Sequence, residues 1–149
     1  MPGRRASPSR TGTKPRSGSR SPVLSPRLVR RIVGAVLAGE RSDATVQVAF
    51  LGPSRMRRLN LRWKGHDRPT DVLSFALPLP DKSLVGDVFV CGQVARRQAR
   101  DLGIPEREEL IRLVVHGTLH ALGYDHPEGA GRTTSAMWRR QERYVRALA

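Results

Sequence analysis

Cysteine is nearly absent from this chain of 149 residues, which contains only Cys91. One cysteine cannot form a disulfide within the chain, so the sequence is not that of a small secreted domain held by disulfides. We expect Cys91 to pack in a strand as a small buried group. Long apolar runs are absent too, because residues 28–37 are interrupted by Arg30 and Arg31 and a membrane span needs roughly 18 apolar residues. The sequence therefore predicts a cytoplasmic protein with no membrane partner.

Acidic residues are missing from the first 39 positions, whereas nine basic residues lie between Met1 and Arg31. The net charge is +14, and the chain after Arg31 has 18 basic against 13 acidic side chains. Residues 1–22 are rich in Ser, Arg, Gly and Pro and have almost no large apolar group to bury. This composition predicts a disordered basic tail before one folded domain, residues 23–149, although an organelle transit peptide has the same composition. The positive charge favours a polyanionic partner.

Histidine is also scarce, but three of the four histidines fall within eleven residues. His116 and His120 are four residues apart, so an α-helix places both imidazoles on one face. Gly123 can adopt a positive φ after the helix and return the chain so that His126 reaches the same point. The spacing predicts one zinc ion per chain on three histidines, with an open fourth position that is typical of a catalytic site. We expect His66, which stands alone in a polar loop, to be solvated.

The same spacing occurs in zinc peptidases, where the residue after the first histidine is a glutamate that serves as the general base. Here that residue is Gly117, which cannot accept a proton. A peptidase is therefore the least favoured interpretation. Met137, which could suggest the methionine turn of such enzymes, is expected in a helix core.

Helix and strand signals alternate along the folded part. A proline in the first turn and an apolar face predict a helix over residues 25–39, and alternation predicts a strand over 45–50. A short helix over 53–62 is expected to turn Met56 and Leu59 inward, before a loop at 64–70. Further strands are expected at 71–75 and 85–91, and further helices at 93–102, 105–122 and 132–148. The order predicts an α+β fold, in which helices pack on a small mixed sheet and the metal site lies at the end of a central helix and the following turn.

Three segments carry a resemblance to a known family. They are Arg68-Pro-Thr-Asp-Val-Leu-Ser-Phe75, Val85-Gly-Asp-Val-Phe-Val-Cys91 and His116-Gly-Thr-Leu-His-Ala-Leu-Gly-Tyr-Asp-His126. From about Leu59 to the C-terminus, the chain resembles the YbeY family of ribosomal RNA maturation endoribonucleases. The resemblance implies a zinc-dependent, single-strand-specific endoribonuclease that acts in 16S rRNA 3′-end maturation and ribosome quality control. Its partners would be single-stranded RNA, an rRNA precursor and the small ribosomal subunit, and its zinc ligands His116, His120 and His126.

The chain departs from the family pattern in two places. Lys64 follows the aromatic residue at a position where the family usually has an arginine, and it keeps the charge but loses the planar fork that binds a phosphate bidentately. Either Lys64 suffices, or Arg62 or Arg68 takes over this contact with the substrate. The usual opening strand of the family is also not visible, so the sheet either begins near Val23 or lacks that edge.

The expected chemistry requires a metal and a cation. Water activated by the metal could attack the phosphorus directly or take the proton of the ribose 2′-OH, while Lys64 stabilises charge on the phosphoryl oxygens. We therefore expect Lys64 and His120 to be essential for catalysis. The alternative function is an rRNA-binding assembly factor in which the zinc is structural.

Several supporting residues have two interpretations each. Asp71 and Asp125 could orient ligands or shape turns, and Thr70 and Ser74 could bind RNA or the local backbone. Trp63 could stack on a base, but we expect it to pack in the core.

Overall fold

The computed structural model describes residues 20–149. Most of the tail expected at residues 1–22 therefore lies outside the described residues. Within residues 20–149, no helix is long and apolar enough to cross a membrane. The elements follow one another as α1 (Pro26–Gly39), β1 (Thr45–Leu51), α2 (Pro53–Lys64), β2 (Val72–Pro78), β3 (Leu84–Cys91), α3 (Gly92–Leu102), α4 (Glu106–Ala121), the 3-10 turn η1 (Arg132–Thr134) and α5 (Ala136–Leu148).

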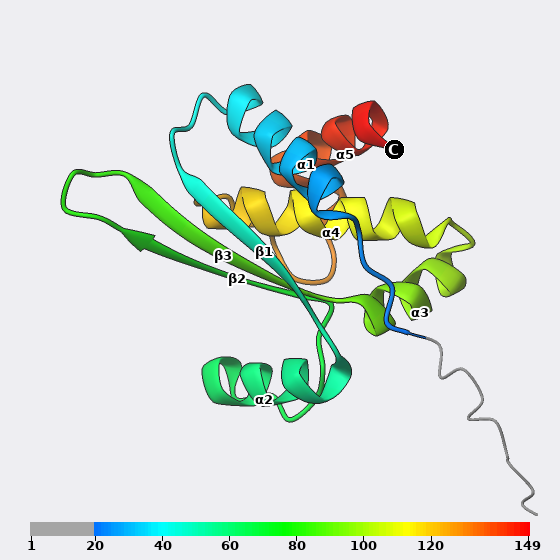
Figure 1. Cartoon of the computed structure of the whole chain (residues 1–149). Coiled ribbons are helices and arrows are strands. Elements are labelled where there is room, and N and C mark those ends of the chain that lie inside the picture. Colours follow the sequence, from blue (N-terminus) through cyan, green and yellow to red (C-terminus); the bar gives the residue numbers. More distant parts are fainter. Residues whose placement is uncertain (1–19) are drawn as a thin grey trace, which may run out of the picture.

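The sheet has the strand order β1-β3-β2 and is mixed, because β3 runs parallel to β1 and antiparallel to β2. Helix α4 covers one face together with α1 and α5, while α2 lies against the other face (Figure 1). Val88 and Val90 point into the larger core under α4, and Leu73 and Cys91 into the smaller one around Met56 of α2. The predicted α+β fold is confirmed. Among the described residues no strand pairs with the free edge of β1. The sheet therefore lacks the usual opening strand of the family and does not begin near Val23.

The central helix α4 is buried on almost every side, as is typical of a helix enclosed by other elements. Ile111, Val114, Val115 and Leu119 are inaccessible to solvent. Three glutamates in its first turn, at 106, 108 and 109, complement the positive end of the helix dipole. The helix therefore holds the side chains of its last turns in fixed positions between the sheet and α5.

Several local expectations were correct. Cys91 is fully buried and Met137 packs in the core, with 1% of its surface exposed. Met56 is buried, Leu59 packs partly buried against the same cluster, and His66 is exposed. These residues follow the pattern of apolar and polar positions that the sequence provides.

Three expectations were wrong. Lys64 is the last residue of α2 and not part of a loop, because the left-handed Gly65 (φ 73°) closes the helix one residue later. The helix expected from residue 132 begins at Ala136, since the Ser135 hydroxyl caps it by accepting the backbone N–H of Trp138. Trp63 is 57% exposed and not in the core, because it lies in the exposed last turn of α2, where its ring packs edge to face with Phe75 and the Arg62 guanidinium lies over it.

Candidate metal centre

The three clustered histidines converge in space. One ring nitrogen from each of His116, His120 and His126 lies within 4.8 Å of the others. The first two project from α4, and the third returns on the following turn, where Gly123 has a φ of 101°. The structure thus brings together the three residues that the spacing singles out, at the end of the central helix.

The tautomer of His116 follows from its hydrogen bond to Gln141. The Nδ1 atom lies 2.6 Å from the Oε1 atom of Gln141, whose Nε2 atom donates to Glu142 at 3.1 Å. The Gln141 oxygen must therefore accept, so Nδ1 of His116 carries the proton and Nε2 keeps a free lone pair. A neutral imidazole with a free Nε2 atom is the form that binds a metal ion.

The backbone orients the ring of His126 in a similar way. Its Nδ1 atom lies 2.9 Å from the carbonyl oxygen of Pro127, which can only accept, so Nδ1 carries a proton and Nε2 is the nitrogen left to bind a metal ion. The Asp125 carboxylate accepts the backbone N–H of His126 at 2.8 Å. Asp125 therefore shapes the turn that presents His126.

Burial keeps the two helical histidines neutral. It is the main cause that lowers the pKa of His116 to about 4, and the positive charge of Arg132 contributes to the shift. Burial also lowers the pKa of His120 from its ordinary value of 6.5. Both rings are therefore uncharged at pH 7, as coordination of a metal requires. Three imidazoles that meet at one point fit a metal ion such as zinc.

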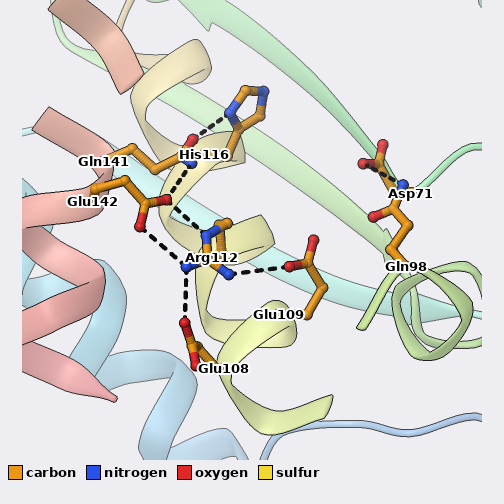
Figure 2. A network of polar contacts seen from close by, with 8 residues as sticks. All are labelled: Asp71, Gln98, Glu108, Glu109, Arg112, His116, Gln141 and Glu142. Atoms are coloured by element: carbon orange, nitrogen blue, oxygen red, sulfur yellow. Dashed lines mark hydrogen bonds and ion pairs between the residues drawn. The ribbon is translucent and has the colours of Figure 1, made fainter. Parts of the chain in front are cut away.

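A polar network supports His116 from behind (Figure 2). The Arg112 guanidinium donates to both carboxylate oxygens of Glu142, at 2.7 and 3.0 Å, and also binds Glu108 and Glu109. Glu142 in turn accepts from Gln141, so the amide that contacts His116 is anchored at its far end. The hydrogen bonds to Glu142 are the main cause that raises the pKa of Arg112 above its ordinary value. This network was not predicted, because the bonded residues Arg112 and Glu142 are 30 positions apart and no motif joins them.

Gly117 lies where α4 approaches the sheet most closely. A Cβ atom there would overlap the Cγ1 atom of Val88 and would lie 3.1 Å from the Oγ atom of Ser74. That hydroxyl donates to the Gly117 carbonyl at 2.8 Å, so Ser74 binds the helix backbone. A side chain at position 117 would point into the sheet, and the geometry has no room for the glutamate of a peptidase.

A cavity of about 600 Å³ begins at His116. It lies between α3, α4 and the start of α5, and Asp71 and Gln98 line its far part. Asp71 accepts the backbone N–H of Val72 and side-chain bonds from Thr70 and Gln98, so Asp71 and Thr70 fix the loop before β2.

The predicted substrate-binding cations are not part of this cavity. Arg62 and Lys64 are exposed at the end of α2, on the sheet face opposite α4, and Arg68 is exposed in the loop that follows. The cation that lines the cavity beside His116 is Arg132, which the sequence patterns did not single out.

Comparison with known proteins agrees with the fold and identifies the family. The family model described as Endoribonuclease YbeY matches residues 23–149. The Endoribonuclease YbeY of Desulfitobacterium hafniense (strain Y51) is 43% identical over 119 residues, which cover 73% of this chain and 74% of the relative. That of Persephonella marina (strain DSM 14350 / EX-H1) is 38% identical over 116 residues, 73% of each chain. The solution structure of TM1509 from Thermotoga maritima shares 30% identity and a TM-score of 0.60, over 86% of this chain and 85% of that one. The chain therefore belongs to the YbeY family of endoribonucleases.

Proposed function

We propose that this protein is a zinc-dependent endoribonuclease that cuts single-stranded RNA in the cytoplasm. Its place of action would be the 3′ end of 16S rRNA and the quality control of ribosomes, with an rRNA precursor or the small subunit as partner. The observation that carries the proposal is the cluster of three imidazoles, two on a buried helix and one on the turn that follows it, in a chain of this family. A strongly basic sequence with a net charge of +14 suits a polyanionic substrate.

The three histidines would hold one zinc ion per chain, because zinc accepts imidazole ligands and a catalytic site keeps one position open. When bound, the ion would supply a Lewis acid for the phosphodiester and lower the pKa of water. Gln141 and the Pro127 carbonyl keep two of the rings in the tautomer that presents Nε2. His120 would be required for cleavage as one of the three ligands.

Cations on the surface would hold the RNA strand. Three exposed cations lie on or just after α2: Arg62, Lys64 and Arg68. None of them forms an ion pair with a described residue. Lys64 is the proposed phosphate contact, in place of the usual family arginine. Trp63 is 57% exposed beside these cations, and its ring can stack on an unpaired base.

The test is cleavage of one RNA in two forms. The zinc-loaded full chain is incubated with a single-stranded RNA that contains the 3′ end of precursor 16S rRNA, and with the same RNA annealed to its complement. We expect cutting of the single strand and protection of the duplex. Cutting of both forms would contradict the strand specificity. Tight binding with no cutting of either form would favour the alternative, an rRNA-binding assembly factor with a structural zinc.

A further inference from the structure

The cavity beside His116 has an end built from η1 and the first turn of α5. Arg132, Thr133 and Trp138 line this end, next to His116 and Gln141. The two helical segments meet there because Ser135 ends η1 and caps α5. A cation and a half-buried aromatic ring thus share one wall of the space that leads to the metal centre.

The Arg132 guanidinium is not neutralised by the protein. Within residues 20–149 it forms no ion pair, and its Nε atom is buried without a hydrogen-bond partner. Arg112, the other arginine that lines the cavity, is bound by three carboxylates. In this part of the chain Arg132 is therefore the cavity arginine whose donors remain available for an anion. A buried donor without a partner costs free energy, which a bound ligand would recover.

The same charge acts on the metal centre. The positive charge of Arg132 opposes protonation of both His116 and His120, so it lies within electrostatic reach of their rings. A divalent ion on the histidines would add to this positive charge. Three carboxylates also line the cavity: Glu109 is bound to Arg112, Asp71 to Gln98, and Asp101 belongs to α3. The wall built from η1 and the first turn of α5 has no acidic residue of its own, so this wall is the part that attracts an anion.

We propose that Arg132 and Trp138 form a subsite for one nucleotide of the RNA strand, with Arg132 binding a phosphate next to the metal centre and Trp138 stacking on the base. An arginine fork can grip two phosphate oxygens at once. Proteins that bind single strands combine a cation for the phosphate backbone with an aromatic ring on which an unpaired base stacks. Neither residue lies in the three segments that carry the family resemblance. The inference rests on the proposed function for the nature of its ligand.

Binding can be measured separately from cleavage, because the chain has only two tryptophans, Trp63 and Trp138. In a Trp63→Phe background, the zinc-loaded full chain is mixed with a ten-nucleotide single-stranded RNA, and fluorescence is followed in the first second. We expect quenching of Trp138. Adding Arg132→Gln should weaken binding about tenfold and reduce the salt dependence of log Kd by about 0.7, the loss of one phosphate contact on a single strand. Arg143→Gln, an equal charge change on the exposed side of α5, should do neither.

Variants of Trp138 test whether its ring stacks on a base. Trp138→Phe should retain binding in the wild-type background, whereas Trp138→Ala should weaken it about tenfold. No quenching of Trp138, or equal effects of Arg132→Gln and Arg143→Gln, would overturn the subsite even if the RNA is cut. Quenching that depends on Arg132 without any cleavage would support the subsite and contradict the nuclease.

Discussion

The Nδ1 atom of His116 lies 2.6 Å from the Oε1 atom of Gln141, and this bond connects the metal-binding helix α4 to α5. The amide nitrogen of Gln141 donates to Glu142, which is bound at both oxygens by Arg112. The orientation of one histidine is therefore fixed by a chain of bonds that starts one helical turn earlier on α4.

Removal of the Gln141 amide should weaken zinc binding. A residue that hydrogen-bonds to a metal-binding histidine typically contributes about 10- to 100-fold to metal affinity. We therefore expect the zinc affinity of Gln141→Ala to fall by a factor in this range. Gln141→Glu should lose less than Gln141→Ala, because a carboxylate still accepts the Nδ1–H of His116, but it gives up the bond to Glu142 and repels that carboxylate. The measurement is competition with a zinc chelator. Gln93→Ala, on the exposed side of α3, is the control and should bind as the wild type does.

A side chain at position 117 should destabilise the fold. Gly117→Ala forces a methyl group against Val88 and Ser74, and overpacking of this kind costs about 1–3 kcal/mol of unfolding free energy. Gly34→Ala is the matched control, since a Cβ on that exposed position of α1 meets nothing within 4 Å and should stabilise the helix by about 0.5–1 kcal/mol. Urea unfolding measures both. Equal stability of the two variants would show that α4 can move away from the sheet.

Acid should weaken the contact between α1 and α5. Burial raises the pKa of Glu40, but hydrogen bonds from two tyrosines and Arg140 bring it below its ordinary value of 4.5. A lowered pKa means that the carboxylate stabilises the fold above about pH 4.5 and that this stabilisation is lost as the pH falls through the folded-state value. Glu40→Gln should therefore cost about 1–2 kcal/mol at pH 7 and progressively less below pH 4.5.

Urea unfolding of both proteins at several pH values provides the comparison. Glu128→Gln, a change at an exposed glutamate, should leave the stability unchanged at each of these pH values. A difference between Glu40→Gln and the wild type that stays constant down to pH 3 would contradict the assigned direction of the shift.

We expect Lys64 to contribute to the cleavage of RNA and not to the stability of the fold. Because its side chain is exposed at the end of α2, Lys64→Ala should leave the thermal unfolding midpoint unchanged while it lowers kcat/KM for single-stranded RNA. We expect a loss of about 10- to 100-fold because Lys64 binds a phosphate of the strand, and recovery in Lys64→Arg. Unchanged cleavage by Lys64→Ala would move this role to Arg62, Arg68 or Arg132.

Local patterns were sufficient to predict much of this structure. The i, i+4 spacing of His116 and His120 and the turn at Gly123 follow from backbone geometry alone, and both are present. The alternating apolar positions of the strands predict their two buried faces. The family was recognised from short segments, because residues at the metal centre and in the tight loop before β2 are adjacent in sequence.

Contacts between distant segments were not predictable in the same way. Gln141 reaches His116 only because α5 packs against α4, and no residue type or spacing on α5 indicates this. Trp63 fits the periodicity of the buried side of α2, yet it is 57% exposed and meets the sheet only through an edge-to-face contact with Phe75. Arg132 is one of many arginines in the sequence, and only its position beside the cavity distinguishes it.

The most direct test is RNA cleavage by the wild type and His120→Ala, prepared identically and with the zinc content of each determined. We predict that the wild type carries about one zinc ion per chain and cuts single-stranded RNA, while His120→Ala keeps the circular dichroism of the folded domain, loses the metal and does not cut. Equal cutting by both proteins, or none by a zinc-loaded wild type, would contradict a nuclease that depends on this metal centre.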